Sequence, residues 1–238
     1  MDLYDIRWHQ FKTHWCNIYT GPDVGGPLML LGPRVPMGTK SLLVAGSIHG
    51  DERSGTLGIV RLLSDPGRFS LPSEVYYLPV VNPSGYIRGQ HLNRWYEDPE
   101  RGWVHQVELG QAPCREYSIL HESANWRNLT VYAHSGYLAF HEDPDATEGY
   151  IYFATGDRRD RPNRKDRLWR RYLHDTLNYW VGAGPDRPWP CDGSMGDALL
   201  HDGVQRIACV ELPMRGDPER NIMAAKHLIV AASTAVFW

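Results

Sequence analysis

The sequence has 238 residues, of which 42% are hydrophobic and 22% are charged, and its formal net charge is −3. These values are typical of a soluble globular protein, and the length favours a single domain spanning residues 1–238. A slightly acidic chain excludes a general electrostatic attraction to nucleic acid or to anionic membranes. No apolar stretch approaches the ~20 residues of a membrane-spanning helix, and residues 1–7 have no signal-peptide pattern, so we expect a cytoplasmic protein.

The first 81 residues predict the beginning of a parallel sheet. Residues 1–40 are rich in aromatic residues, glycine and proline, which favours an opening helix or turn and an antiparallel edge strand or hairpin. Residues 41–46 and 75–81 are continuous apolar runs, as found in strands that are buried on both faces. Between them, residues 55–63 carry apolar side chains at helical spacing. A strand, a helix and a strand in this order predict a βαβ unit with a right-handed crossover.

Two polar residues follow the first apolar run. His49 and Glu52 are three positions apart, just beyond the carboxyl end of the predicted strand, where open α/β sheets bind their ligands. An imidazole and a carboxylate within one turn can both coordinate one Zn²⁺, which then needs a third protein ligand and an open position for water. The alternative interpretation of this H-x-x-E pair is a solvated turn in which the two side chains hydrogen-bond to each other.

A later strand offers the third ligand. Residues 86–114 are polar and aromatic and predict a long ordered loop, whereas residues 115–132 have the spacing of a helix. Residues 137–140 form a short apolar run that ends at His141, so a second strand delivers polar residues to the same edge of the sheet. We choose His141 as the third metal ligand over His134, which stands at a helix-to-strand turn.

The last third of the chain completes an α/β pattern. Residues 148–154 and 205–210 are strand candidates, and the second of them ends at Glu211. Residues 157–171 mix basic and acidic side chains and lead into a helix, which we interpret as a solvated helix face rather than a nucleic-acid-binding patch. Residues 218–235 predict a closing apolar helix. Strands that alternate with helices indicate the α/β class.

Five short segments, taken in order, resemble the zinc carboxypeptidase family. Its clan also contains murein peptide amidases and the succinylglutamate desuccinylase and aspartoacylase group. The resemblance covers residues from about 40 to 235 and implies a single zinc carboxypeptidase-like catalytic domain, built as a three-layer, mostly parallel mixed sheet flanked by helices. The segments are G-S-I-H-G-D-E from Gly46, N-P-S-G-Y from Asn82, L-N-R from Leu92, F-H-E-D from Phe140 and V-E-L-P from Val210.

The resemblance implies a role for each residue of the catalytic centre. It makes His49, Glu52 and His141 the zinc ligands. It makes Glu211 the general base, the carboxylate that takes a proton from the attacking water and passes it to the leaving amine.

The resemblance also implies a set of substrate-binding residues. Asn93 and Arg94 match the pair that binds the terminal carboxylate of the substrate, where a guanidinium offers bidentate bonds. Arg88 matches the arginine that stabilises the oxyanion. His91 stands where relatives usually have aspartate, and the spacing is compressed, so the roles of Arg88 and Arg94 could be exchanged.

The implied reaction is zinc-dependent hydrolysis of an amide or peptide bond next to a free carboxylate, by a carboxypeptidase or peptide amidase acting on a short peptide. An alternative within the clan is a deacylase of the succinylglutamate desuccinylase and aspartoacylase type, which would act on an N-acyl amino acid. An alternative of another class is a ligand-binding protein that keeps the fold without the chemistry. Tyr150 and Tyr152 are candidates for the family's mobile tyrosine that caps the substrate, with a place in the core as the alternative for each.

Overall fold

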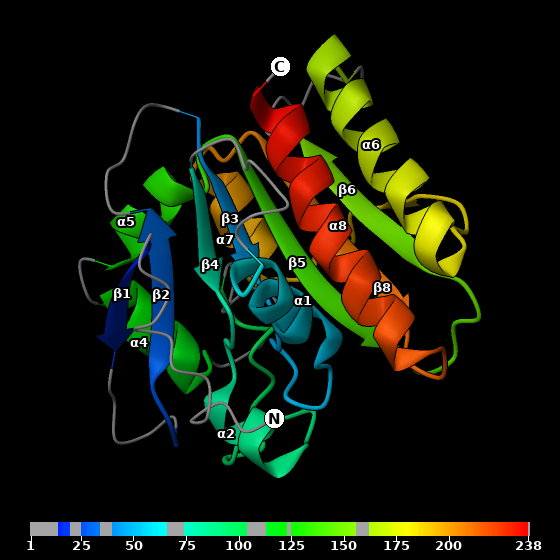
Figure 1. Cartoon of the computed structure of the whole chain (residues 1–238). Helices are drawn as coiled ribbons and strands as arrows, with labels where there is room; N and C mark the ends of the chain where they lie inside the picture. The colour runs from blue at the N-terminus through cyan, green and yellow to red at the C-terminus, as the bar shows by residue number, and fades with distance from the viewer. Residues whose placement is uncertain are drawn as a thin grey trace.

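The computed structural model describes residues 14–19, 25–33, 40–65, 74–103, 113–122, 125–155 and 162–237, which form a sheet with helices on both faces (Figure 1). The strands within these ranges are β1 (His14–Tyr19), β2 (Leu28–Pro33), β3 (Leu42–Ala45), β4 (Val75–Leu78), β5 (Gly136–Asp143), β6 (Tyr150–Thr155), β7 (Arg187–Pro188) and β8 (Arg206–Pro213). The helices are α1 (Ser54–Leu63), α2 (Pro83–Arg88), α4 (Arg115–Glu122), α5 (Asn125–Tyr132), α6 (Arg164–Val181), α7 (Met195–His201) and α8 (Pro218–Phe237).

The strands lie in the order β1-β2-β4-β3-β5-β8-β6-β7. The four central strands, β4, β3, β5 and β8, are parallel to one another, and β2 and β6 run antiparallel to them on either side. The first two strands form an antiparallel pair at one edge, as the composition of residues 1–40 predicts. The α/β class and the mostly parallel mixed sheet are therefore confirmed.

Both faces of the central strands are apolar, which explains why the sequence shows continuous apolar runs there. Leu42 and Val44 of β3 join the core cluster beneath α1, α6 and α8. Leu43 and Ala45 point the other way and join the cluster beneath α4, α5 and α7. The molecule is thus three layers thick, with α1 and α8 in front of the sheet and α4, α5 and α7 behind it in Figure 1.

Residues 115–132 form two helices, α4 and α5, so the prediction of one helix was wrong. Trp103 contacts both helices: its ring centroid lies 5.1 Å from that of Tyr117 in α4 and 5.6 Å from that of Trp126 in α5. Its indole therefore joins α4 and α5 in one aromatic cluster.

Two short helices also differ from the prediction: α2 extends into residues 86–114, which we expected to form a loop, and α7 was not predicted. Both have polar N-terminal caps. Asn82 Oδ1 accepts a hydrogen bond from the backbone N of Gly85 at 2.8 Å, and a proline follows the cap. Ser194 Oγ accepts one from the backbone N of Asp197 at 3.2 Å, with the reciprocal contact of a capping box. Each of these helices therefore begins at a residue whose side chain caps its first turn.

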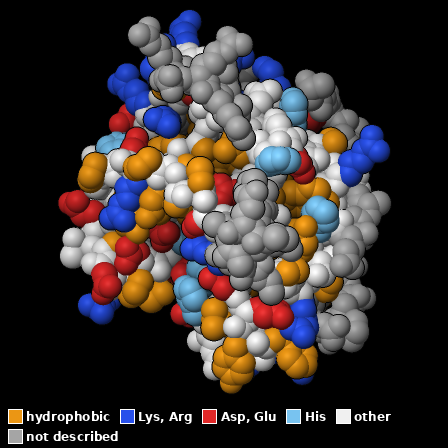
Figure 2. Space-filling model, turned by 180° about the vertical axis from the view of Figure 1, so that it is seen from behind, with side chains coloured by type: hydrophobic (Ala, Val, Ile, Leu, Met, Phe, Trp, Pro, Cys, Tyr) orange, Lys and Arg blue, Asp and Glu red, His pale blue; other side chains and the backbone are white. Residues whose placement is uncertain are grey.

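The surface carries charges of both signs. On the face opposite to that of Figure 1, acidic, basic and apolar side chains are interspersed (Figure 2). Within the part of the chain that the structure describes, no helix combines the length and the apolar character that a membrane span requires.

Candidate metal centre and active-site cavity

The loop after β3 carries His49 and Glu52 into α1. The loop turns sharply at Ser47, whose φ of 43° is unusual for a residue with a side chain. Ser47 Oγ donates a hydrogen bond to the backbone O of Glu52 at 3.0 Å and lies 2.7 Å from Thr56 Oγ1. A Cβ atom on Gly50 would lie 2.0 Å from a backbone atom of Gly85. Buried polar contacts and close packing thus give this loop one conformation.

The neighbouring strands bring the other two predicted residues to the same edge of the sheet. Strand β5 lies between β3 and β8, and all three are parallel, so their carboxyl ends adjoin. His141 and Glu211 are register partners across β5 and β8. Glu142 follows His141 and accepts hydrogen bonds from the backbone N and the Oγ of Ser54, at 3.2 and 2.6 Å. This contact ties the end of β5 to the first turn of α1.

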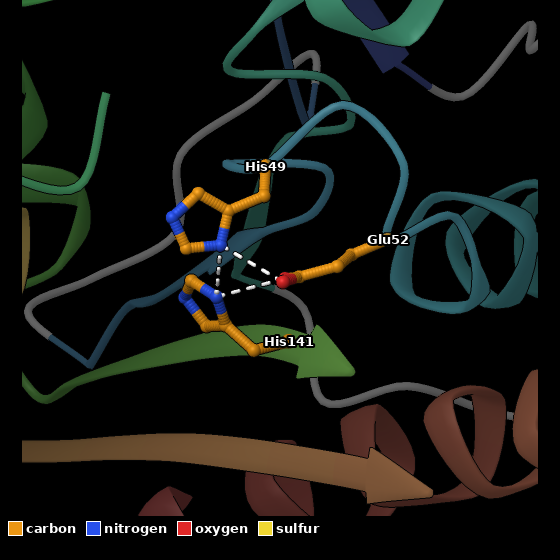
Figure 3. Close-up of side chains that lie close together, drawn as sticks. All are labelled: His49, Glu52 and His141. Carbon is orange, nitrogen blue, oxygen red and sulfur yellow. Dashed lines mark hydrogen bonds and ion pairs between the residues drawn. The ribbon is translucent and has the colours of Figure 1, made fainter. Parts of the chain in front are cut away.

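The His49, Glu52 and His141 side chains point toward one another (Figure 3). Nδ1 of His49 lies 2.9 Å from Glu52 Oε1, Nδ1 of His141 lies 2.9 Å from Glu52 Oε2, and the two Nδ1 atoms are 3.2 Å apart. Ligands at ~2.0–2.2 Å from a tetrahedral zinc ion lie ~3.3–3.5 Å from one another. Small outward shifts of all three side chains would therefore produce zinc distances, and the donor set of two imidazoles and one carboxylate fits this metal.

Asp98 determines which nitrogen of His49 is free to bind a metal. Its Oδ1 lies 3.3 Å from His49 Nε2. Although burial raises the pKa of Asp98, its hydrogen bond and attraction to His49 lower it to about 2, so the carboxylate is ionised and accepts the hydrogen of Nε2. Nδ1 is then the ring nitrogen that faces the Glu52 carboxylate, and it is the nitrogen that could coordinate a metal ion once it gives up its proton. An outer carboxylate that orients a histidine ligand is usual at zinc sites.

The cluster is electrostatically suited to a cation. Burial lowers the pKa of His49, but its hydrogen bonds to Asp98 and Glu52 outweigh burial and raise the pKa to about 9. Burial raises the pKa of Glu52, and the two histidines more than reverse this and hold it at about 2. Glu52 is therefore a buried carboxylate that stays ionised and needs positive charge beside it.

A cavity of about 160 Å³ adjoins this cluster. Burial raises the pKa of Glu211, and the nearby Glu52 and Asp143 raise it further against the opposing effect of His141. A carboxylate with a raised pKa beside a metal centre can accept a proton and return it. The cavity is lined by His49, Glu100, Arg101, His141, Tyr152, Trp189, Pro190, Asp192, Ser194, Cys209 and Glu211.

Four predicted substrate-binding residues lie elsewhere. Arg88, at the end of α2, and Arg94 are exposed, and neither lines the cavity. Asn93 is buried within its own loop, where its Nδ2 donates hydrogen bonds to two glutamates at 2.8 and 2.9 Å. Tyr150 is 7% exposed, and its hydroxyl donates a hydrogen bond to Asp143 Oδ2 at 2.7 Å. The other tyrosine considered, Tyr152, does line the cavity.

The site residues that were missed include Asp98, Glu100 and Arg101, which lie close together in the chain. They follow the L-N-R segment closely and lie in the loop that we expected to be ordered. The Asp98-Pro99 pair was a usable signal, because Asp before Pro favours a turn. Asp98 Oδ1 indeed accepts a hydrogen bond from the backbone N of Glu100 at 2.9 Å. That turn places the next two side chains on the cavity.

Comparisons with known proteins point to one fold. No protein-family model matches the sequence, and no curated protein sequence does. A candidate metallopeptidase from Shewanella amazonensis is 24% identical, with a TM-score of 0.80 and coverage of 97% of this chain and 89% of that chain. A metallo-carboxypeptidase from Burkholderia cenocepacia is 15% identical, with a TM-score of 0.70 and coverage of 94% and 65%. One from Pseudomonas aeruginosa, in complex with (2-guanidinoethylmercapto)succinic acid, is 16% identical, with a TM-score of 0.69 and coverage of 93% and 64%.

Sequence identities this low support a shared fold but do not show a shared reaction. The match extends over nearly the whole chain, including the parallel strands whose ends hold His49, Glu52 and His141. The chain therefore has the fold of the zinc carboxypeptidases, as the resemblance of its five segments implies.

Proposed function

We propose that this protein is a zinc-dependent hydrolase that cleaves an amide or peptide bond next to a free carboxylate, as a carboxypeptidase or peptide amidase. The observation that carries the proposal is the convergence of His49 Nδ1, Glu52 and His141 Nδ1 within 3.2 Å of one another, beside a cavity that Glu211 also lines. The site combines a metal-binding donor set, a proton acceptor and room for a small substrate.

When bound, zinc would lower the pKa of a coordinated water and polarise a carbonyl oxygen. Glu211 takes a proton from the attacking water and passes it to the leaving amine, because a buried carboxylate with a raised pKa is competent in both directions. Asp98 keeps His49 in the tautomer whose Nδ1 faces the cluster. Glu142 holds the end of β5 against α1 and so fixes His141 relative to Glu52.

We assign the cationic contact with substrate to Arg101. It is the one lysine or arginine among the described residues that line the cavity, whereas Arg88 and Arg94 are exposed outside it. A guanidinium can bind the terminal carboxylate of a substrate or stabilise the developing oxyanion. Arg101 Nη1 also lies 2.9 Å from Asp192 Oδ2, which orients the side chain.

The test begins with metal analysis of the purified, unchelated protein. We expect about one zinc per chain, followed by hydrolysis of N-acylated dipeptides. Glu211→Gln should keep the zinc and lose a factor of about 10²–10⁴ in kcat, because the proton acceptor is gone while the ligands remain. Normal turnover by this variant would exclude Glu211 from the mechanism. Absence of zinc, with no recovery on adding it, would favour the ligand-binding alternative.

A second candidate activity is deacylation of an N-acyl amino acid. The cavity, at about 160 Å³, is smaller than the ~300–1,000 Å³ of sites for drug-sized ligands. A cavity of this size suits an N-acyl amino acid as well as it suits a short peptide. Parallel assays with N-acetyl and N-succinyl amino acids and with dipeptides of the same terminal residue separate the two. Faster hydrolysis of the acyl amino acids would make deacylation the main activity.

A further inference from the structure

Asp51, Glu52 and His91 form a second cluster of metal-binding side chains beside the first. His91 Nδ1 lies 3.3 Å from Asp51 Oδ1 and 3.6 Å from Glu52 Oε1. Donors that share a tetrahedral zinc ion lie ~3.3–3.5 Å from one another, so these separations need little adjustment. The proposed mechanism uses neither Asp51 nor His91.

Asp51 Oδ1 is a buried oxygen that lacks a hydrogen bond. Although it lies 3.3 Å from His91 Nδ1, it has no hydrogen-bond partner in the part of the chain that the structure describes. The neighbouring Arg53 is engaged by Tyr86: its Nη2 donates a hydrogen bond to the backbone O of Tyr86 at 2.7 Å, and its guanidinium lies over the Tyr86 ring. A buried carboxylate oxygen without a partner is costly, and a bound cation would satisfy it.

His91 is held beside the first cluster by its backbone and by its ring. Its backbone O accepts hydrogen bonds from the backbone N of Gly50 at 3.3 Å and from Asn82 Nδ2 at 3.1 Å. Its ring stacks on that of His49, with centroids 3.6 Å apart and an angle of 18° between the planes. These contacts position the imidazole next to the two carboxylates of the second cluster.

From this geometry we propose that Asp51, Glu52 and His91 bind a second divalent metal ion, Zn²⁺ or Mn²⁺. One imidazole and two carboxylates suit either ion. Glu52 Oε1 lies 2.9 Å from His49 Nδ1 and 3.6 Å from His91 Nδ1, so Glu52 bridges the two ions. The 3.6 Å between the stacked rings matches the ~3.5–4 Å between the ions of two-metal sites. The inference rests on the metal centre of the proposed function, because Glu52 belongs to both clusters.

The second ion is held more weakly than the first. The side chains of His91 and Asp51 are 48% and 34% exposed, whereas those of His49 and His141 are 9% and 5% exposed. Ligands on partly exposed side chains are less rigidly held, and water competes with them for the ion. The second ion is therefore lost during purification and returns when metal is supplied in excess.

The test is a zinc titration of the metal-free protein by equilibrium dialysis and elemental analysis. We expect saturation at about two zinc ions per chain. His91→Ala and Asp51→Asn should each saturate at about one ion, because the first cluster keeps all its ligands. His134→Ala and Asp145→Asn are matched changes at exposed residues outside both clusters, and they should bind as many ions as the unmodified protein.

Manganese gives a second readout that does not depend on activity. Two Mn²⁺ ions that share the Glu52 carboxylate are spin-coupled. The electron paramagnetic resonance spectrum of the fully loaded protein should therefore show coupling that is absent from His91→Ala. Circular dichroism checks that both variants are folded.

Two outcomes would overturn the inference and leave the hydrolase proposal standing: saturation of the unmodified protein at about one ion, or a second ion that His91→Ala and Asp51→Asn both retain. The opposite outcome is also distinct. Two ions bound through Asp51 and His91, without hydrolysis of any substrate, would contradict the proposed function and support the second metal site.

Discussion

The two walls of the cavity are built in different ways. One wall consists of strand ends, where His141 and Glu211 are register partners on paired parallel strands. The other consists of two loops, which contribute Glu100 and Arg101 on one side and Asp192 on the other. The loops are joined by the ion pair of Arg101 with Asp192 at 2.9 Å and by a backbone hydrogen bond from Trp103 to Gly193 at 2.9 Å.

This difference separates the chemistry from the selection of the substrate. Backbone ladders on both sides of β5 fix the groups that would hold the metal and move the proton. Side-chain contacts between loops fix Arg101, the residue to which we assign a contact with substrate, and such contacts change without altering the sheet. Substitutions in the strand-end wall should therefore abolish function, whereas substitutions in the loop wall should change stability, affinity or preference.

The largest effect is expected at the strand-end wall. His49→Ala removes one of three ligands, so we expect the protein to lose its zinc and all metal-dependent activity. His134→Ala is the matched control, because His134 is exposed and lies outside the cluster. Elemental analysis of both variants checks the prediction. Undiminished zinc in His49→Ala would remove His49 from the ligand set.

In the loop wall, Glu100 should make the stability of the protein depend on pH. Burial raises the pKa of Glu100 from 4.5 to about 7, so the folded state holds this proton more tightly than the unfolded state does. The stability due to this proton is present below pH 4.5 and is lost as the pH rises through about 7, which amounts to about 3 kcal/mol.

Glu100→Gln removes that dependence. Relative to the unmodified protein, the variant should gain about 3 kcal/mol between pH 4.5 and pH 8. Urea unfolding of the metal-free proteins at the two pH values measures the change. The same stability difference at both pH values would show that Glu100 does not titrate in this range.

The smallest effect is expected at Asp98, the loop residue whose carboxylate contacts His49. Asp98→Asn cannot accept the hydrogen of His49 Nε2 as a carboxylate does, so zinc affinity should fall by about 10–100-fold, or about 1.4–2.7 kcal/mol. Asp145→Asn changes an aspartate whose side chain is 89% exposed and should leave zinc affinity unaltered. Competition with a chromogenic chelator measures both. An affinity in Asp98→Asn equal to that of the control would mean that Asp98 does not orient His49.

The strand-end wall could be predicted from sequence because topology alone determines it. Apolar runs that stop at His49, His141 and Glu211 mark strand ends, and parallel strands bring their carboxyl ends to one edge. The packing of α4 and α5 could not be predicted, since Tyr117 and Trp126 contact Trp103, a residue that precedes both helices in the chain.

The loop wall could not be predicted for the same physical reason. No ladder of backbone hydrogen bonds fixes the direction of a side chain in a loop. The L-N-R segment therefore indicated which residue types were present but not where their side chains point. Asn93 Oδ1 accepts hydrogen bonds from the backbone N of Trp95 and of Glu97, both at 2.9 Å, and so shapes its own loop. Glu100 and Arg101 reach the cavity through the turn that Asp98 makes. The sequence pattern does not determine the backbone conformation of that turn.

The two histidines of the cluster stand 92 residues apart in the chain although their Nδ1 atoms are 3.2 Å apart. A growing or refolding chain that has formed only β3 and α1 offers His49 and Glu52 alone, and two ligands hold zinc weakly. If the protein binds zinc as proposed, tight binding would therefore require the pairing of β5 with β3, a contact of long sequence separation. Under the proposed function, metal binding would therefore report that the central sheet is complete, and activity would arise only after β5 has paired with β3.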